Sequence, residues 1–97
     1  MFDTLAKPYV LRLYVTDATP KSARAIVNAR RLLEEHLHDR YSLEILNIAE
    51  HVAQATADQI VCAPTLLRLA PLPARRIIGD MSDVARVLGG LDVQPPR

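Results

Sequence analysis

Apolar side chains recur at every second position of residues 9–15, and most positions between them are apolar as well, with Arg12 as the charged exception. A segment that is apolar on both sides predicts a strand in the interior of a sheet. Residues 41–48 alternate in the same way but have a more polar second side, so we expect a second strand there.

Between these two segments the apolar spacing changes to three and four residues, which predicts a helix. Thr19 supplies a capping hydroxyl, and Pro20 suits the first helical position. The stripe that we expect to cover the sheet consists of Ile26, Ala29, Leu32, Leu33, His36 and Leu37. A helix that joins two neighbouring strands in this way makes them parallel, with a right-handed crossover.

Two more helices are predicted in the second half of the chain. Residues 50–61 are rich in alanine and weakly amphipathic; the side chains on one side are Val52, Thr56 and Ile60. The last helix begins after Ser82, has Asp83 as its cap and extends to Leu88, because Gly89-Gly90 can adopt positive φ and end it.

Prolines divide the segment between these two helices. Pro64 has no backbone donor, so it must open the strand that we expect over residues 65–69. Pro71 and Pro73 end that strand, and a short strand over residues 75–78 completes an antiparallel hairpin.

The predicted order is strand, helix, strand, helix, strand, strand, helix, which is the thioredoxin-like βαβαββα succession of an α/β sandwich. We expect a single domain over residues 1–97, with its core at about 8–92 and a frayed tail at 93–97. In such folds the proline before the third core strand is commonly cis and faces the partner-docking site, which makes Pro64 the candidate for that position.

Composition is that of an ordinary globular domain, with a net charge of +1, so it gives no reason to expect a nucleic-acid partner. The residues at the N-terminus lack a charged and an apolar signal region, and no apolar run approaches the roughly 18 residues of a membrane span. We therefore expect a cytoplasmic protein with no membrane segment.

The residues that an enzyme of this architecture would use are absent from the positions where we would expect them. Cys62 is the only cysteine, and the loop over residues 16–22 after the first strand contains none. Ser22 has no neighbouring histidine to activate it, so it is expected to satisfy backbone donors in the first helical turn. Cys62 is expected to be a small buried apolar residue. We expect no catalytic residue, cofactor or metal.

Several segments carry a more specific signal. They are residues 9–15, 19–25, 41–43, 63–66, 71–83 and 87–92. The stretch least expected to match a family by chance is Arg75-Arg76-Ile77-Ile78-Gly79-Asp80. Together they resemble the KaiB family of circadian clock proteins over roughly residues 8–92.

The resemblance implies a non-catalytic protein that binds the ATPase ring of a KaiC-like hexamer and changes its output. It also implies fold switching, in which a homotetramer with the alternative ground-state order βαββααβ rearranges its C-terminal half into a thioredoxin-like monomer. Pro64, Pro71 and Pro73 would then be slow isomerising joints. Gly90 and Asp92 match positions that bias the equilibrium between the two folds.

Four arginines match basic positions that the family uses around its interaction surfaces, namely Arg24, Arg68, Arg75 and Arg76, and the alternative is that they form only a solvated basic face; Glu44 is the fifth residue that we expect at a partner-binding position. Guanidinium groups can form bidentate pairs with acidic side chains of a partner. Glu44 replaces a typical lysine on the second strand, where secondary partners such as KaiA or an output kinase dock. The resemblance therefore implies attachment to a KaiC-like ring more strongly than engagement of KaiA.

Two other function classes stay open at the level of the sequence. One is a redox-inactive thioredoxin-like adaptor or sensor that docks a histidine kinase or a stress-response partner. The other is a redox or glutathione-dependent enzyme whose activity would depend on Cys62.

Overall fold

The computed structural model describes residues 8–16 and 19–92. Along the chain its elements are β1 (Tyr9–Val15), α1 (Pro20–Leu37), β2 (Tyr41–Asn47), the 3-10 helix η2 (Ile48–Glu50), α2 (Val52–Ala57), β3 (Thr65–Ala70), β4 (Arg75–Ile78) and α3 (Val84–Leu91). The predicted thioredoxin-like succession is confirmed, and the alternative ground-state order is not the one that this structure adopts. The frayed tail expected at 93–97 lies outside the described residues.

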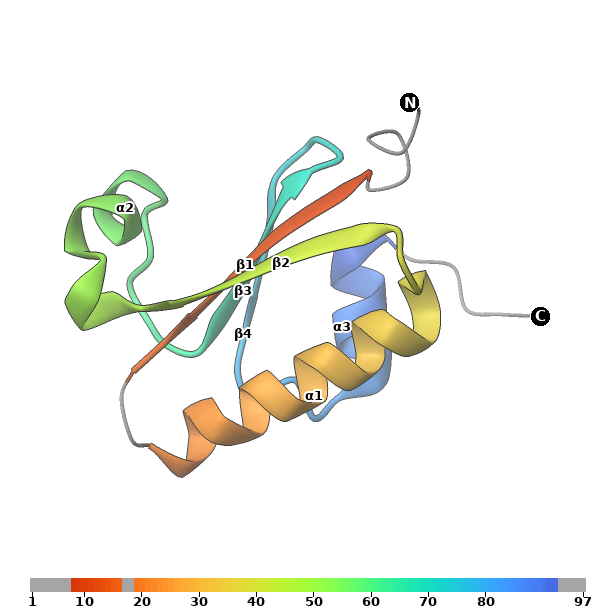
Figure 1. The fold of residues 1–97 in the computed structure, drawn as a ribbon, viewed down its shortest axis with the longest axis horizontal. Helices are drawn as coiled ribbons and strands as arrows, with labels where there is room; N and C mark the ends of the chain where they lie inside the picture. The colour runs from red at the N-terminus through yellow and green to blue at the C-terminus, as the bar shows by residue number, and fades with distance from the viewer. Residues whose placement is uncertain (1–7, 17–18, 93–97) are drawn as a thin grey trace.

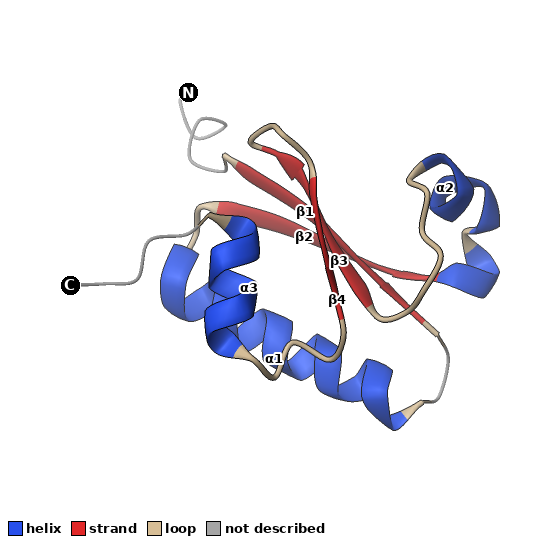
Figure 2. Cartoon of the chain, turned by 180° about the vertical axis from the view of Figure 1, so that it is seen from behind, coloured by secondary structure: helices blue, strands red, loops and turns tan. Residues whose placement is uncertain are grey.

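The four strands form one sheet in the order β2-β1-β3-β4. β1 is parallel to β2 and antiparallel to β3, and β3 and β4 form an antiparallel hairpin. β1 is therefore an interior strand, as its two apolar sides predict. Figures 1 and 2 show α1 and α3 together on one side of the sheet, while α2 lies apart from them at the far end of the strands.

The main core fills the space between the sheet and the helices α1 and α3. Its buried members are Leu11, Leu13, Val15, Ala25, Ala29, Leu32, Leu33, Leu37, Leu66, Ile77, Met81, Val87 and Leu91. The apolar stripe predicted for the first helix supplies four of these residues. Thr19 caps α1 by accepting a hydrogen bond from the Ser22 N–H, and Pro20 occupies the first turn, as predicted.

A second, much smaller cluster lies on the other face of the sheet. Tyr14, Leu46 and Ala55 are buried there, with Ile48 and Ile60 packed against them. The helix predicted over residues 50–61 is shorter in the structure, because a 3-10 turn occupies its start and α2 ends at Ala57. Of the side chains predicted to share one side of this helix, Val52 is 60% exposed and Ile60 packs against the cluster, while the buried residue of α2 is Ala55.

The last helix is longer than predicted, because Gly89 and Gly90 lie inside it. α3 extends to Leu91, and the residue with positive φ that ends it is Asp92, at φ 58° and ψ 36°. A carbon atom added as Cβ at Gly90 would lie 2.8 Å from Cγ1 of Ile77. The close approach of helix and strand explains this glycine better than helix termination does. The Asp83 cap is confirmed by its hydrogen bond from the Arg86 N–H.

Three peptide bonds before proline are cis: Ala63–Pro64, Ala70–Pro71 and Leu72–Pro73. Pro64 itself is fully buried, and its carbonyl accepts a hydrogen bond of 3.0 Å from the Gly79 N–H. Within this chain the ring of Pro64 is therefore part of the interior and does not offer a free docking surface.

Candidate interaction surface

The loop after β1 is where a redox-active protein of this architecture would carry its nucleophilic thiol. The Ser22 hydroxyl accepts a hydrogen bond of 3.1 Å from the Thr16 N–H, and the Ser22 N–H donates to Oγ1 of Thr19 at 3.2 Å. Ser22 is buried. Its hydroxyl therefore has a structural role, as predicted, but the backbone donor that it satisfies follows β1, whereas the donor in the first turn of α1 is satisfied by the Thr19 hydroxyl.

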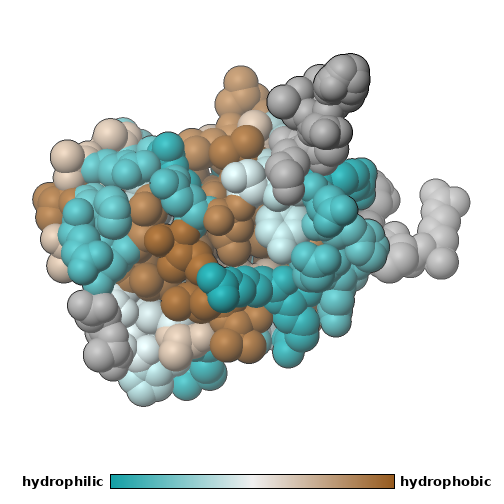
Figure 3. All heavy atoms as spheres, viewed as in Figure 1, coloured by the Kyte–Doolittle hydropathy of each residue, from teal (hydrophilic) through white to brown (hydrophobic). Residues whose placement is uncertain are grey.

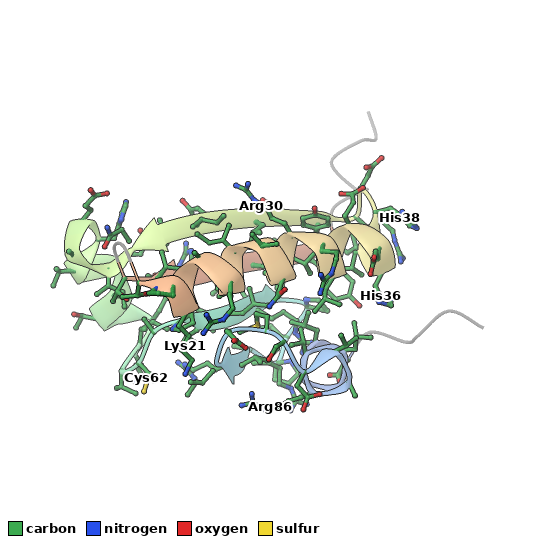
Figure 4. All side chains as sticks on the ribbon, turned by 90° about the horizontal axis from the view of Figure 1, so that it is seen from below. Lys21, Arg30, His36, His38, Cys62 and Arg86 are labelled. Carbon is green, nitrogen blue, oxygen red and sulfur yellow. The ribbon has the colours of Figure 1, made fainter. Side chains whose placement is uncertain are left out.

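Cys62 lies in the loop between α2 and β3, and the prediction that it is buried was wrong. Its side chain is exposed, and Figure 4 shows it pointing away from the body of the molecule. The neighbouring Val61 is 88% exposed as well, so this part of the loop before β3 packs against neither face of the sheet. The Thr65 hydroxyl donates to the Cys62 carbonyl at 2.8 Å, which fixes the backbone here and leaves the thiol free of the core.

A row of charged side chains crosses the sheet on the face that is not covered by α1 and α3. In the register Glu44 pairs with Arg12, Arg12 with Leu67, and Leu67 with Arg76, so the row extends over all four strands. Glu44 and Arg12 form an ion pair of 3.3 Å. Leu67 is buried between the two arginines of the row, as expected where long aliphatic stems cover apolar surface.

Asp58 joins this row to the end of α2. Its Oδ2 accepts a hydrogen bond of 2.6 Å from the Tyr14 hydroxyl and one of 2.9 Å from Nη1 of Arg12. Its main-chain carbonyl accepts a bond of 2.8 Å from Nη2 of Arg76. Burial, and then the hydrogen bond to Asp58, raise the pKa of Tyr14 to about 12. The hydrogen bond to Asp58 likewise raises the pKa of Arg12.

Glu44 and Arg76 were predicted from the sequence as partner-binding residues, but Arg12 and Asp58, which connect them, were not. Arg12 gave a signal, because it is the single charge in an otherwise apolar strand. Asp58 gave none, since its partners Arg12 and Tyr14 are 46 and 44 residues away in the chain.

Arg68 is buried in this fold, whereas its predicted role in partner binding would need an exposed side chain. Its side chain is 2% exposed and lies on the main-core side of β3. Nη1 donates to the Leu91 carbonyl at 2.6 Å, and Nη2 donates to the Pro73 carbonyl at 2.7 Å. The residue ties the loop of Pro71 and Pro73 to the C-terminal end of α3.

Arg75 lies next to this buried arginine but is half exposed. Its Nη2 is 3.6 Å from Oδ2 of Asp92, and the same oxygen is 3.4 Å from Nη1 of Arg68. Asp92 therefore balances two arginines at the end of α3. Arg75 and Arg76 point to opposite faces of the sheet, because neighbouring residues of a strand alternate.

Arg24 lies on α1, away from all of these residues. Its Nε forms an ion pair of 3.1 Å with Oδ2 of Asp80 in the loop between β4 and α3. Hydrogen bonds from Ser82 and Arg24 lower the pKa of Asp80. The five charged residues predicted from the sequence therefore do not form one patch: Glu44 and Arg76 share a face, Arg24 and Arg75 lie elsewhere, and Arg68 is buried.

A groove of about 500 Å³ lies between α1 and the edge strand β2. Its lining consists of Arg30, Arg31, Glu34, Tyr41, Leu43 and Ile45. Figure 3 shows an apolar area at the centre of this side of the molecule with polar side chains around it, and Figure 4 shows Arg30 on the side of α1 toward β2. The Tyr41 hydroxyl donates to Oε1 of Glu34 at 3.0 Å, and burial raises the pKa of Tyr41.

Among residues 8–16 and 19–92, no group of three or more His, Cys, Asp or Glu side chains is placed to hold a metal ion. Within the same residues, no helix is long and apolar enough to cross a membrane.

Comparison with known proteins gives consistent matches over most of the chain. The family model described as the KaiB domain matches residues 12–93. The circadian clock oscillator protein KaiB of Prochlorococcus marinus (strain MIT 9313) is 45% identical over 87 residues, which are 90% of this chain and 73% of the relative. The circadian clock protein KaiB3 of Synechocystis sp. (strain PCC 6803) is 44% identical over 86 residues, covering 89% of this chain and 84% of the relative.

Two solved structures show the fold. The N-terminal domain of Synechococcus elongatus SasA matches with a TM-score of 0.71 and 23% identity, covering 96% of this chain and 91% of that domain. Mitochondrial thioredoxin 3 of Saccharomyces cerevisiae matches with a TM-score of 0.72 and 12% identity, covering 92% of this chain and 82% of that protein.

The protein is therefore a domain of the thioredoxin-like class, and the loop after its first strand contains no cysteine. The chain belongs to the KaiB family, whose named relatives are circadian clock proteins.

Proposed function

We propose that this protein is a non-catalytic clock or signalling component that binds a KaiC-like ATPase hexamer and modulates its phosphorylation or output. The observation that carries the proposal is the 45% identity to a circadian clock oscillator protein KaiB over 90% of the chain. The solvent-facing charges of Arg24, Arg75 and Arg76 support it, because guanidinium groups suit acidic surfaces on a macromolecular partner.

Arg24 and Arg75 are the sharpest probes of this binding. Each forms an exposed ion pair, which contributes about 0 to 1 kcal/mol to folding, so its removal leaves the domain folded. The chain is mixed with a KaiC-like ATPase hexamer in ATP and in ADP, and co-elution is followed by size-exclusion chromatography. We expect co-elution of the wild type and weaker binding of Arg24→Gln and Arg75→Gln.

Arg40→Gln serves as the matched control, because Arg40 is an exposed arginine outside the predicted set. Wild-type protein that fails to co-elute with either nucleotide would remove the proposal. Equal binding of all three variants would remove the assignment of Arg24 and Arg75 while leaving the partner in place.

Fold switching is the second part of the proposal. Residues after about 50 would have another arrangement in a homotetramer, with Pro64, Pro71, Pro73, Gly90 and Asp92 at the positions that differ between the two states. The structure here is the proposed binding-competent form. Backbone chemical shifts of residues 50–92, measured together with the native mass, report both fold and assembly. A single monomeric species with unchanged shifts at every concentration would contradict switching.

An alternative proposal is a redox-inactive adaptor that docks a histidine kinase. The fold match to the N-terminal domain of SasA favours this second candidate. A pull-down from the native cytosol separates the two, because a KaiC-like ATPase and a histidine kinase differ in mass and sequence. Neither candidate function includes binding to KaiA, since Glu44 reverses the charge that family members typically carry on β2.

A further inference from the structure

The segment Ile48–Ile60, which we call the strap, covers one end of the second face of the sheet. Of its thirteen positions only Ala55 is buried, and the cluster beneath it contains just two further buried residues, Tyr14 and Leu46. The main core on the opposite face contains thirteen buried residues. Because apolar burial is the main stabilising contribution, the strap is held far less strongly than α1 or α3.

The strap also has little helical stability of its own. α2 has six residues, its first turn has no side-chain cap, and the chain leaves it through Gln59 at a positive φ of 59°. An isolated helix of this length is not stable in water, because the hydrogen bonds of one or two turns do not offset the free energy needed to nucleate the helix. Contacts with the sheet must therefore keep α2 folded.

Asp58 makes the shortest polar contacts between the strap and the strands β1 and β4. Its carboxylate binds the hydroxyl of Tyr14 and the guanidinium of Arg12 on β1, and its carbonyl binds the guanidinium of Arg76 on β4. The Gln54 amide oxygen, placed so that both amide atoms are satisfied, lies 3.2 Å from two nitrogens of Arg12. Hydrogen bonds that involve a charged group are the strong ones.

We propose that the strap opens as a separate unit while the four-stranded sheet, α1 and α3 stay folded, and that Asp58 is the latch that sets how often it does so. Opening removes the cover from Tyr14 and Leu46 and so changes which surface the second face of the sheet presents. The charged row stays on the sheet when the strap leaves, because Glu44, Arg12 and Arg76 all belong to strands. This inference does not depend on the identity of any partner.

Hydrogen exchange of the native protein, read residue by residue by NMR, tests the proposal. The reporters are the amides of Ala55, Asp58, Gln59 and Ile60, which donate to carbonyls within the strap. In the wild type we expect these amides to exchange at least tenfold faster than the slowest paired amides of β1 and β3, after correction for intrinsic rates. In Asp58→Asn the strap amides should exchange about tenfold faster again, with the amides of β1 and β3 unchanged.

Glu44→Gln is the matched control, because it removes the other ion pair of Arg12 without touching the strap. It should leave the exchange of the strap amides within about twofold of the wild type. Tyr14→Phe removes one of the two side-chain bonds to the Asp58 carboxylate and should give an intermediate acceleration.

The proposal would be overturned by wild-type strap amides that exchange as slowly as those of β1 and β3, since the strap would then open only when the whole domain unfolds. If Asp58→Asn accelerates the hydrogen exchange of all amides equally, or accelerates none, Asp58 is not the latch. The wild-type measurement needs no variant, so it decides the first point even if Asp58→Asn fails to fold.

Discussion

Arg68 Nη1 donates a hydrogen bond of 2.6 Å to the main-chain carbonyl of Leu91, 23 residues further along the chain. The guanidinium is almost completely buried, and its second nitrogen binds the carbonyl of Pro73. A buried cation is costly unless its donors are used, and in Arg68 both terminal nitrogens are used while the buried Nε has no partner. Arg68 therefore holds three parts of the molecule in place: β3, the loop before β4 and the end of α3.

Replacing this residue with lysine should destabilise the domain although the charge is kept. A lysine ammonium is a compact group on a flexible stem and cannot reach both carbonyls in the planar arrangement of a guanidinium. We expect Arg68→Lys to lower the free energy of unfolding by about 2 to 4 kcal/mol. Urea unfolding followed by circular dichroism measures this loss.

Arg75→Lys is the control for that experiment, because Arg75 is half exposed and pairs with the same Asp92. Its effect should stay within about 0.5 kcal/mol of the wild type. Equal losses in the two variants would show that the arrangement around the buried guanidinium contributes nothing special.

Two neighbouring glycines of α3 should respond differently to alanine. At Gly89 an added Cβ meets nothing within 4 Å, so alanine should stabilise this fold by about 0.5 to 1 kcal/mol through its better helix propensity. At Gly90 the Cβ would lie 2.8 Å from Cγ1 and 2.9 Å from Cδ1 of Ile77, so that side chain must move. Gly90→Ala should therefore be less stable than Gly89→Ala in thermal unfolding.

Sedimentation of the same pair addresses assembly. If the position of Gly90 sets the balance between two folds, Gly90→Ala should alter the ratio of monomer to tetramer and Gly89→Ala should not. An unchanged ratio in Gly90→Ala would speak against a switching role for that position.

The order of elements could be predicted from the sequence because each depends on local signals. Thr19 and Pro20 indicate the start of α1, and the apolar residues on both sides of residues 9–15 indicate an interior strand. Local signals failed where distant contacts decide the outcome. Arg68 looks like a surface charge, but its partners Pro73 and Leu91 become neighbours only when the hairpin and α3 pack together.

The charged row and its connection to α2 were predictable only in part, for the same reason. Arg12 stands out in an apolar strand, whereas Asp58 is one carboxylate in a weakly patterned segment. The register that brings them together is set by the pairing of β1 with its two neighbours. A pattern along one strand gives the face on which a residue lies, but it does not give the partner across the sheet.

The exposure of Cys62 predicts an accessible thiol in the folded protein. Titration with a chromogenic disulfide reagent should release one equivalent per chain without denaturant. Cys62→Ser should release none and should unfold within about 0.5 kcal/mol of the wild type, because the side chain contributes nothing to the core. A thiol that reacts only after denaturation would contradict its position in the loop.

Tyr14 should make the stability of the domain fall at alkaline pH. Its pKa is raised from an ordinary value of 10.0 to about 12 in the folded protein, first by burial and then by Asp58. Because the folded state holds the phenolic proton more tightly, the contribution of Tyr14 is complete below pH 10 and is lost as the pH rises toward 12. The total loss is about 2 to 3 kcal/mol, measurable as a decrease in the urea midpoint between pH 9.5 and 11.5.

Tyr14→Phe is the variant that isolates this effect, since it removes the titrating hydroxyl and keeps the ring that fills the small cluster beneath α2. At pH 8 it should cost about 0.5 to 1.5 kcal/mol for the lost hydrogen bond to Asp58. At pH 11.5 the two proteins should differ less, or in the opposite sense, because the variant has no proton to release at this position. The absorbance of tyrosinate at 295 nm gives a second readout: in the folded wild type the phenol of Tyr14 should still be protonated at pH 11. A phenol that ionises near pH 10 in the native protein would mean that Tyr14 is not enclosed by Asp58 and the strap in solution.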